Sequence, residues 1–173
     1  MSISFNNDWS QFTLRVFIRA DKKIIFDAWT KQGGMEEWFL KRAQFFFNDK
    51  PLHKGEIATK NCVFEWTWYG WPEMIQKGEM IEVVENEKIV FSFEPAGIVT
   101  IVFEEAEDNC TQLILQQTGI PTTEEGKKNF FYGCSLGWSF WLVNLKAWLE
   151  YGILLDEREH NFDDARKLEI VNQ

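Results

Sequence analysis

Cysteine and histidine are scarce in this sequence of 173 residues. The three cysteines, Cys62, Cys110 and Cys134, lie far apart and form no CxxC pair, and an odd number does not suit a framework of disulfides. The two histidines, His53 and His160, do not have the spacing of metal ligands. We therefore expect neither a bound metal nor a cofactor, and we interpret the cysteines as small, mostly buried hydrophobic residues.

Long apolar runs and positive charge are also lacking. No run approaches the roughly 18 apolar residues of a membrane-spanning helix, so we expect no insertion into a membrane. Lys and Arg number 18 against 27 Asp and Glu, which gives a net charge of −9 and disfavours nucleic acids and anionic membranes as partners. The polar residues from Met1 to Gln11 are unlike a signal peptide, and we therefore expect a cytoplasmic location.

Recognisable catalytic motifs are absent as well. The sequence has no GxSxG, no HExxH, no phosphate-binding loop and no plausible Ser/His/Asp set. Glu65 alternates with Phe64 and Trp66, so an inward aromatic face would leave Glu65 in solvent, whereas a shifted register would bury it as a candidate acid or base. We expect the solvated arrangement, with Glu82 on the surface beside a lysine and His53 exposed. The sequence therefore identifies no catalytic residue and favours a protein without enzymatic activity.

Aromatic side chains, by contrast, are abundant. They make up 16% of the chain, with 9 Trp and 16 Phe. Each ring can bury roughly 150–250 Å² of surface, so a domain of this size uses many of them in its core. The remainder could line a pocket or cover an interface, or all of them could fill a solid core. The sequence leaves these alternatives open.

The first part of the chain predicts a strand followed by two helices. Residues 12–19 alternate as in a half-buried strand, whose apolar face holds Phe12, Leu14, Val16 and Ile18. A helix should follow an N-cap at Asp21 and end at Gly33-Gly34. Its apolar residues recur at helical spacing: Ile24, Ile25, Ala28 and Trp29. A second, short helix should hold Met35, Trp38 and Phe39.

The middle of the chain predicts a run of short strands. They fall at 43–47, 56–60, 62–70, 75–84, 88–94, 98–105 and 111–118. The breaks between them are rich in Asn, Asp, Gly and Pro, which favour turns; they lie at 48–51, 70–72, 85–87, 95–97 and 108–109. Strands joined this tightly pair antiparallel, because a parallel pair needs a long crossover. The sequence therefore predicts an antiparallel meander.

The last part of the chain predicts a long helix. A capping box of Thr122 and Glu125 should start a helix of about two turns, with a break at Gly133. Residues 135–154 should then form one helix of roughly 30 Å. Its apolar stripe comprises Trp138, Trp141, Leu142, Leu145, Trp148 and Leu149, with Ser139, Lys146 and Glu150 on the other side. The highly charged tail, 156–173, is expected to be solvated.

This order of elements resembles the START-like, or SRPBCC, superfamily. Short phrases resemble its branch named after the activator of heat-shock-protein ATPase; they lie at 25–30, 35–39, 78–83, 88–93 and 111–115. The most specific phrase closes the long helix, with Gly137, Trp138, Leu142, Asn144, Leu145, Lys146, Leu149, Glu150 and Gly152. The resemblance covers about residues 12–155 and implies an α+β helix-grip fold. In such a fold a curved antiparallel sheet wraps around the long C-terminal α-helix, with two short helices after the first strand.

We expect a single START-like domain over residues 1–155, with the charged tail 156–173 either part of the same domain or disordered. Members of the superfamily often hold a hydrophobic cavity between the sheet and the last helix. We predict that the residues lining it are Trp38, Phe39, Phe64, Trp66, Trp68, Phe91, Phe93, Ile101, Phe103, Leu113, Leu115, Trp141 and Leu145. Flat rings at such a cavity favour a flat apolar ligand, with one hydrogen bond to a Trp N–H.

Three functions remain open, because the fold does not choose among them. The favoured hypothesis is non-catalytic binding of a small hydrophobic molecule in an apolar cavity of a few hundred Å³. The second is a domain with a filled core that binds a chaperone or another protein. However, the chaperone activators of this branch carry a further N-terminal domain, for which there is no room before Phe12. The third is a cyclase or hydrolase, which needs polar side chains in the cavity. We expect a monomer or a homodimer.

Overall fold

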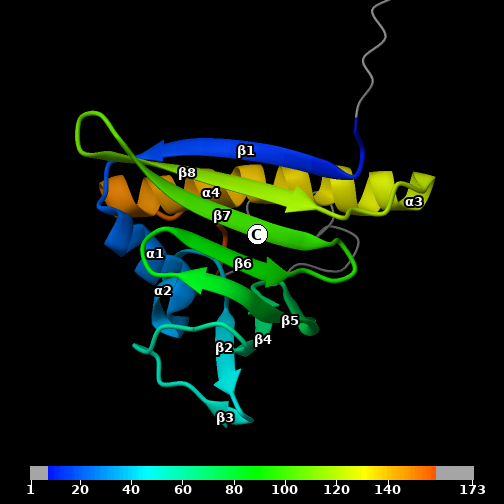
Figure 1. Cartoon of the computed structure of the whole chain (residues 1–173), viewed down its shortest axis with the longest axis horizontal. Coiled ribbons are helices and arrows are strands. Elements are labelled where there is room, and N and C mark those ends of the chain that lie inside the picture. The colour runs from blue at the N-terminus through cyan, green and yellow to red at the C-terminus, as the bar shows by residue number, and fades with distance from the viewer. Residues whose placement is uncertain (1–7, 159–173) are drawn as a thin grey trace, which may run out of the picture.

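A curved, eight-stranded antiparallel sheet and a long helix make up most of the protein. The computed structural model describes residues 8–158. Its elements are β1 (Gln11–Ile18), α1 (Lys22–Thr30), α2 (Gln32–Trp38), β2 (Arg42–Phe47), β3 (Lys50–Pro51), β4 (Val63–Trp68), β5 (Trp71–Val84), β6 (Lys88–Ser92), β7 (Ile98–Ala106), β8 (Cys110–Thr118), α3 (Glu124–Gly126), the π-helical segment η1 (Lys127–Tyr132) and α4 (Gly133–Tyr151). Helix α4 runs along one face of the sheet, and α1 and α2 lie together at one end (Figure 1). The expected α+β helix-grip fold is confirmed.

The strand order is β1-β8-β7-β6-β5-β4-β2-β3. Strands β4 to β8 follow one another as antiparallel neighbours, which confirms the predicted meander. The first strand returns to pair with the last one, so that Leu14 lies opposite Leu115, and Leu115 lies opposite Ile101 of β7. This long-range pairing places three apolar side chains in a row on the face that meets α4.

The register of β4 agrees with the expected inward aromatic face. Phe64 and Trp66 are buried, whereas Glu65 points outward and its Oε1 lies 2.6 Å from Nζ of Lys77. Glu82 likewise pairs with Lys88 on the surface, at 2.7 Å, and His53 is exposed. None of these groups lies in the interior, so the predictions for all three are confirmed.

Two strand predictions between β2 and β4 are wrong. Residues 56–60 form no strand, because they make only a single bridge, between Lys31 and Ile57. Lys50 and Pro51, which were assigned to a turn, form the short strand β3 instead. Asn48 and Asp49 both have positive φ, as the tight two-residue turn of a β-hairpin requires, and this turn folds β3 back onto β2.

The glycine pair after α1 does not end that helix. The Asp21 side chain caps α1 as expected, accepting a 2.7 Å bond from Lys23 N, but the helix ends at Thr30 and both glycines lie inside α2. A Cβ on Gly34 would lie 2.5 Å from the carbonyl oxygen of Asp27. Glycine is therefore needed here for the close approach of α1 and α2. Ile24, assigned to the apolar face of α1, is exposed to solvent.

The C-terminal helix is longer and starts differently than expected. Thr123, not Thr122, is the N-cap, and its Oγ1 accepts a 3.0 Å bond from Gly126 N. Gly133 has helical dihedral angles, so the helix continues without a break from α3 through η1 into α4. It ends at Tyr151, where Gly152 adopts a left-handed conformation that glycine tolerates at no steric cost.

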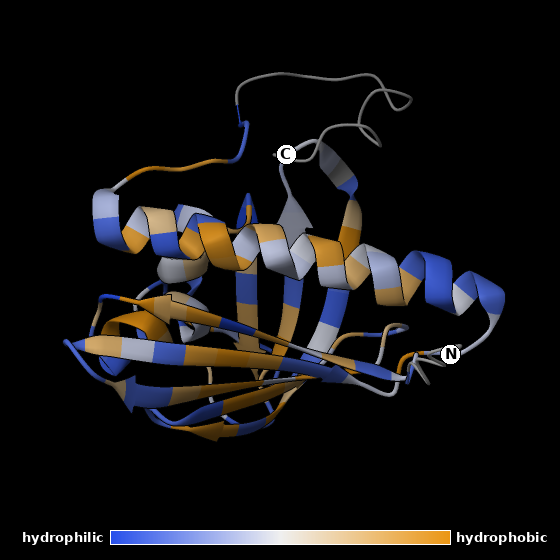
Figure 2. Cartoon of the chain, turned by 90° about the horizontal axis from the view of Figure 1, so that it is seen from above, coloured by the Kyte–Doolittle hydropathy of each residue, from blue (hydrophilic) through white to orange (hydrophobic). Residues whose placement is uncertain are grey.

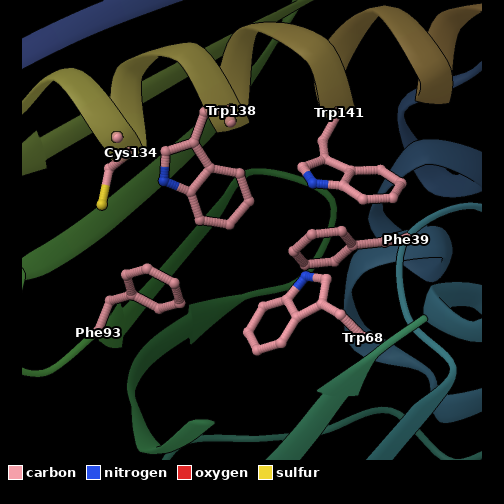
Figure 3. A pocket seen from close by; sticks show the side chains of 8 residues that line it. Phe39, Trp68, Phe93, Cys134, Trp138 and Trp141 are labelled. Atoms are coloured by element: carbon pink, nitrogen blue, oxygen red, sulfur yellow. The ribbon is translucent and has the colours of Figure 1, made fainter. Parts of the chain in front are cut away.

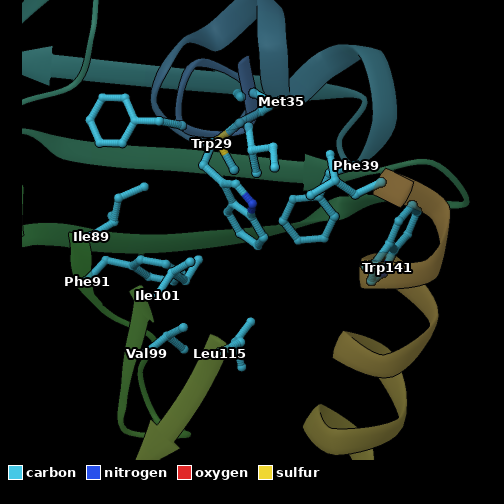
Figure 4. Packing of buried hydrophobic residues seen from close by; sticks show 14 of the residues in the cluster. Trp29, Met35, Phe39, Ile89, Phe91, Val99, Ile101, Leu115 and Trp141 are labelled. Atoms are coloured by element: carbon cyan, nitrogen blue, oxygen red, sulfur yellow. The ribbon is translucent and has the colours of Figure 1, made fainter. Parts of the chain in front are cut away.

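The apolar stripe of α4 packs onto an aromatic core (Figure 4). Trp29 on α1 lies 4.9 Å from Trp38 and 5.8 Å from Trp138, measured between ring centroids. On β4, Phe64 and Trp66 stack at 3.9 Å. Rings thus fill most of the space between the sheet and α4, as the solid-core alternative expected, and a pocket lies near one end of the helix.

The first residues of the charged tail are held in place rather than solvated. The carboxylate of Asp156 has no exposed side-chain surface and accepts a 3.0 Å bond from Asn144 Nδ2 of α4. Arg158 donates to the backbone carbonyls of Glu36 and Glu37, which closes the chain over α2. Residues 159–173, for which a solvated tail was expected, lie outside the described residues. Within residues 8–158, no helix is long and apolar enough to span a membrane.

Candidate functional site

A pocket of about 170 Å³ lies between the first half of α4, the end of α2 and the sheet. Its lining comes from four parts of the chain: Phe39 after α2, Trp68 at the end of β4, Phe93 after β6, and Gly133, Cys134, Gly137, Trp138 and Trp141 on α4. Figure 3 shows these rings grouped around the opening, with the Cys134 thiol beside them. No charged side chain takes part in the lining. The pocket is therefore an aromatic, almost wholly apolar site.

Two glycines on α4 make room for the pocket. Gly133 and Gly137 are four residues apart, so both face the same side of the helix. A Cβ added at either position would meet no atom within 4 Å, which means that each glycine borders open space. Glycine is also unfavourable inside a helix, by roughly 0.5–1 kcal/mol relative to alanine. The missing side chains are thus what leaves the pocket open.

The aromatic walls hold one another in fixed orientations. Phe39 meets Trp141 edge-on at 5.1 Å and Trp68 edge-on at 5.9 Å, and its other face stacks on Trp38 at 5.0 Å. The Trp38 indole is itself anchored, because its Nε1 donates a 3.1 Å bond to the carbonyl of Ala28 on α1. The wall formed by Phe39 is therefore rigid before any ligand arrives.

A buried glutamine anchors the opposite wall. Gln117 of β8 is fully buried; its Oε1 accepts a 2.8 Å bond from Trp138 Nε1, and its Nε2 donates a 2.8 Å bond to the Ala96 carbonyl. These bonds connect α4 through the sheet to the turn before β7. Burial raises the pKa of the Cys134 thiol, a shift that a hydrogen bond with Gln117 only partly opposes. Cys134 is therefore a neutral thiol at neutral pH and a poor nucleophile.

The pocket gathers only part of the predicted ligand-lining set. Phe39, Trp68, Phe93 and Trp141 line it. The other predicted residues lie in the solid core: Trp38, Phe64, Trp66, Phe91, Ile101, Phe103, Leu113, Leu115 and Leu145. The volume is also smaller than the few hundred Å³ expected. The binding of a ligand by any of these residues stays a prediction.

The residues that α4 contributes to the pocket around Trp141 were not predicted from the sequence. Trp138 was assigned to the apolar stripe but not to a cavity, and Gly133 was interpreted as a helix break. The signal was the spacing of Gly133, Gly137 and Trp141, which repeats every four residues and so places two missing side chains beside an aromatic one. That spacing gains meaning only when the helix is known to be continuous.

A second hollow, of about 410 Å³, lies where the β7–β8 hairpin meets the start of α1. Its lining is polar, but its groups serve the local structure. Lys22 Nζ lies 3.1 Å from Glu105 Oε1, the Asp21 carboxylate caps α1, and Thr111 Oγ1 donates to the Ala20 carbonyl. Within residues 8–158, no group of His, Cys, Asp and Glu side chains could hold a metal ion. The aromatic pocket is therefore the better candidate for a binding site.

Solved structures share this architecture at low sequence identity. A Staphylococcus saprophyticus protein superposes with a TM-score of 0.65 and 16% identity, over 83% of this chain and 94% of its own. The Aha1 dimer from Colwellia psychrerythraea superposes with a TM-score of 0.63 and 17% sequence identity, over 82% of this chain and 97% of its own. A Mesorhizobium loti protein superposes with a TM-score of 0.65 and 16% sequence identity, over 83% of this chain and 99% of its own. Likeness at these identities establishes the fold alone.

Sequence comparison goes further than these structures. No protein of curated function matches the chain. A family model does match, over residues 19–150, from the end of β1 to the last turn of α4. Its description is Activator of Hsp90 ATPase homolog 1-like protein, which agrees with the resemblance noted from the sequence phrases. The chain therefore belongs to the Activator of Hsp90 ATPase homolog 1-like family.

Proposed function

We propose that this protein binds a small, flat, apolar molecule in the aromatic pocket and performs no chemistry on it. The observation that carries the proposal is the pocket itself, about 170 Å³ of space bounded by rings and by two helix positions without side chains. An engineered apolar cavity of about 150 Å³ is known to admit benzene, whereas drug-sized ligands need roughly 300 Å³ or more. The expected ligand therefore has one or two fused rings.

The polar features of the pocket support a ligand with one hydrogen-bond acceptor. The Trp138 N–H is already bonded to Gln117. The indole N–H groups of Trp68 and Trp141 have no acceptor within residues 8–158, and both rings border the pocket. Either can donate to an oxygen or nitrogen acceptor on a bound molecule. A ring with one such acceptor thus fits better than a pure hydrocarbon.

The lining also supports binding without catalysis. General acid–base chemistry requires titratable groups within hydrogen-bond reach of the substrate. The only titratable group in the lining is the Cys134 thiol, whose raised pKa keeps it protonated. A cyclase or hydrolase would need more than this.

Titration with 6-fluoroquinoline, which has two fused rings and one nitrogen acceptor, tests the proposal, observed by ¹⁹F NMR on the full chain. We expect saturable binding to the native protein and none to G137L, because a leucine at Gly137 projects into open space and fills the pocket without a clash. The matched control is G55L, since a Cβ on Gly55 also meets nothing within 4 Å but lies away from the pocket. Equal binding to G137L and the native protein, or no binding at millimolar probe, would refute the proposal.

Protein binding, with a chaperone as partner, is the second candidate. The family description and the largely filled core favour it. A chaperone ATPase assay separates the two functions: a surface role predicts the same change in ATPase rate from the native protein and from G137L. Stimulation by both proteins, together with no binding of 6-fluoroquinoline, would assign the function to the surface.

A further inference from the structure

The outer face of α4 is an exposed apolar stripe. Helix α4 lies across the sheet with one long side turned away from it (Figure 2). On that side the exposed fraction is 50% for Tyr132, 70% for Leu136, 51% for Val143 and 67% for Tyr151. Successive positions are four, seven and eight residues apart, close to whole numbers of helical turns, and so lie along one side of the helix. Most amphipathic helices place charged side chains there.

This face also carries almost no charge. From Tyr132 to Tyr151 the only charged residues are Lys146 and Glu150, although charged residues make up 26% of the chain. Lys146 Nζ lies to one side of the stripe and bonds the Phe17 carbonyl of β1 and the Glu150 carboxylate. Interface centres are depleted in charged residues and enriched in aromatic ones, whereas ordinary exposed helix faces are not. The face therefore has the composition of a protein interface.

Together with the half-buried Phe140 and Ala147, the residues of the stripe are arranged symmetrically about the middle of the helix. Tyr132 and Tyr151, Leu136 and Ala147, and Phe140 and Val143 are pairs at equal distances from the midpoint between Trp141 and Leu142. If a second α4 packs antiparallel across this face, Leu136 of each copy meets the small Ala147 of the other. Such self-complementarity is what a two-fold symmetric interface requires, because the same patch is used twice.

We infer that two copies of this protein associate through the outer faces of their α4 helices, packed antiparallel about a two-fold axis. The 19 residues of α4 give a contact line of about 28 Å. The exposed parts of the stripe side chains offer roughly 500 Å² per copy, so two copies bury roughly 1,000 Å². This is the lower bound of a specific interface, and we expect a dissociation constant in the micromolar range.

The dimer is independent of the proposed ligand pocket. The pocket lies on the side of α4 that faces Phe39 and Trp68, whereas Leu136 and Val143 face away from the sheet. A substitution on the outer face therefore leaves 6-fluoroquinoline binding unchanged, and G137L leaves the dimer intact. Failure of one proposal can thus be recognised without the other.

Sedimentation velocity of the full chain tests the inference, from about 1 μM to about 1 mM, a range that brackets an interface of this size. We expect the native protein to pass from monomer to dimer, and L136K and V143E each to weaken association about 100-fold or more, because each buries an unpaired charge. The matched control is I24K on α1, since Ile24 is 52% exposed and lies outside the stripe. It should dimerise like the native protein, with all variants keeping the native melting temperature.

The orientation has its own test. In an antiparallel pair position 136 faces position 147, so L136K and A147E should each be monomeric alone and form a dimer when mixed. In a parallel pair position 136 faces itself, so the mixture would only relieve the repulsion between like charges and would form no ion pair. A native protein that stays monomeric, a dimer retained by both L136K and V143E, or a mixture without association would each overturn the inference. It would also be overturned if only a chain truncated after Arg158 dimerises, because residues 159–173 would then cover the face.

Discussion

Gln117 links the pocket wall to the sheet, and this link can be measured with a double-mutant cycle. Gln117 is fully buried and makes a hydrogen bond at each end of its amide, to Trp138 Nε1 and to the Ala96 carbonyl. Q117L removes both bonds with little change in volume. W138F removes the indole N–H donor and part of the buried ring. The double variant lacks both partners of the Trp138–Gln117 bond.

The expected magnitudes follow from the groups left unpaired. Q117L leaves the Trp138 N–H and the Ala96 carbonyl buried without partners, at about 1–3 kcal/mol each, or about 2–6 kcal/mol in total. W138F leaves Oε1 of Gln117 unpaired, at about 1–3 kcal/mol, and adds a packing loss of roughly 1 kcal/mol. The double variant has neither the Trp138 N–H nor the Gln117 oxygen left to be buried without a partner, so it should lose about 2–6 kcal/mol less than the sum of the single losses.

Urea unfolding followed by far-UV circular dichroism gives the four free energies without relying on tryptophan fluorescence. The control cycle pairs Q117L with W141F, which removes an indole from the same pocket without removing a Gln117 bond. Its two losses should add. Losses that add within about 0.5 kcal/mol for Q117L with W138F would refute the argument that the buried bond holds the pocket wall.

The other predictions concern the helices. G34A should lower the free energy of unfolding by about 1–3 kcal/mol, because its Cβ would lie 2.5 Å from the Asp27 carbonyl oxygen. G137A should raise the free energy of unfolding by about 0.5–1 kcal/mol, because its Cβ meets open space and alanine favours a helix more than glycine does. Thermal melts of the two variants and the native protein measure both changes. Burial raises the pKa of Glu150, but hydrogen bonds from Lys146 and from the backbone N–H of Arg19 lower it by more. The pKa of Glu150 in the folded protein is therefore below the ordinary value of 4.5. Its contribution is therefore present above pH 4.5 and lost as the pH falls through the folded pKa, so the native protein and E150Q should differ in stability at neutral pH and converge in acid; a constant difference would contradict this.

Features that depend on neighbouring residues could be predicted from the sequence. Period-two alternation placed Phe64 and Trp66 inward and Glu65 outward, because successive side chains of a strand point to opposite faces. The spacing of Trp138, Trp141 and Leu145 placed the inner face of α4 correctly for the same kind of reason. Together with the turn residues, these patterns were enough to predict a meander and a long packed helix.

Features that depend on distant residues could not be predicted in this way. Gly34 suggests a helix end when considered alone, yet it lies inside α2 because α1 passes within van der Waals distance of it. The pairing of β1 with β8 joins residues about a hundred positions apart, and no local pattern records it. A short segment can often adopt more than one local structure. Only the folded chain shows which of these structures packs against the segments that surround it.

The pocket shows this division most clearly. The sequence by itself determined that the interior would be rich in rings and poor in charge, since composition and alternation fix which side chains leave water. The tertiary structure alone decided which rings pack solidly and which border a space, because that depends on how α4 lies over Phe39 and Trp68. In a closely packed interior the absence of a single side chain is enough to leave a space. Gly133 and Gly137 lack side chains where the helix crosses the sheet, and the pocket lies there.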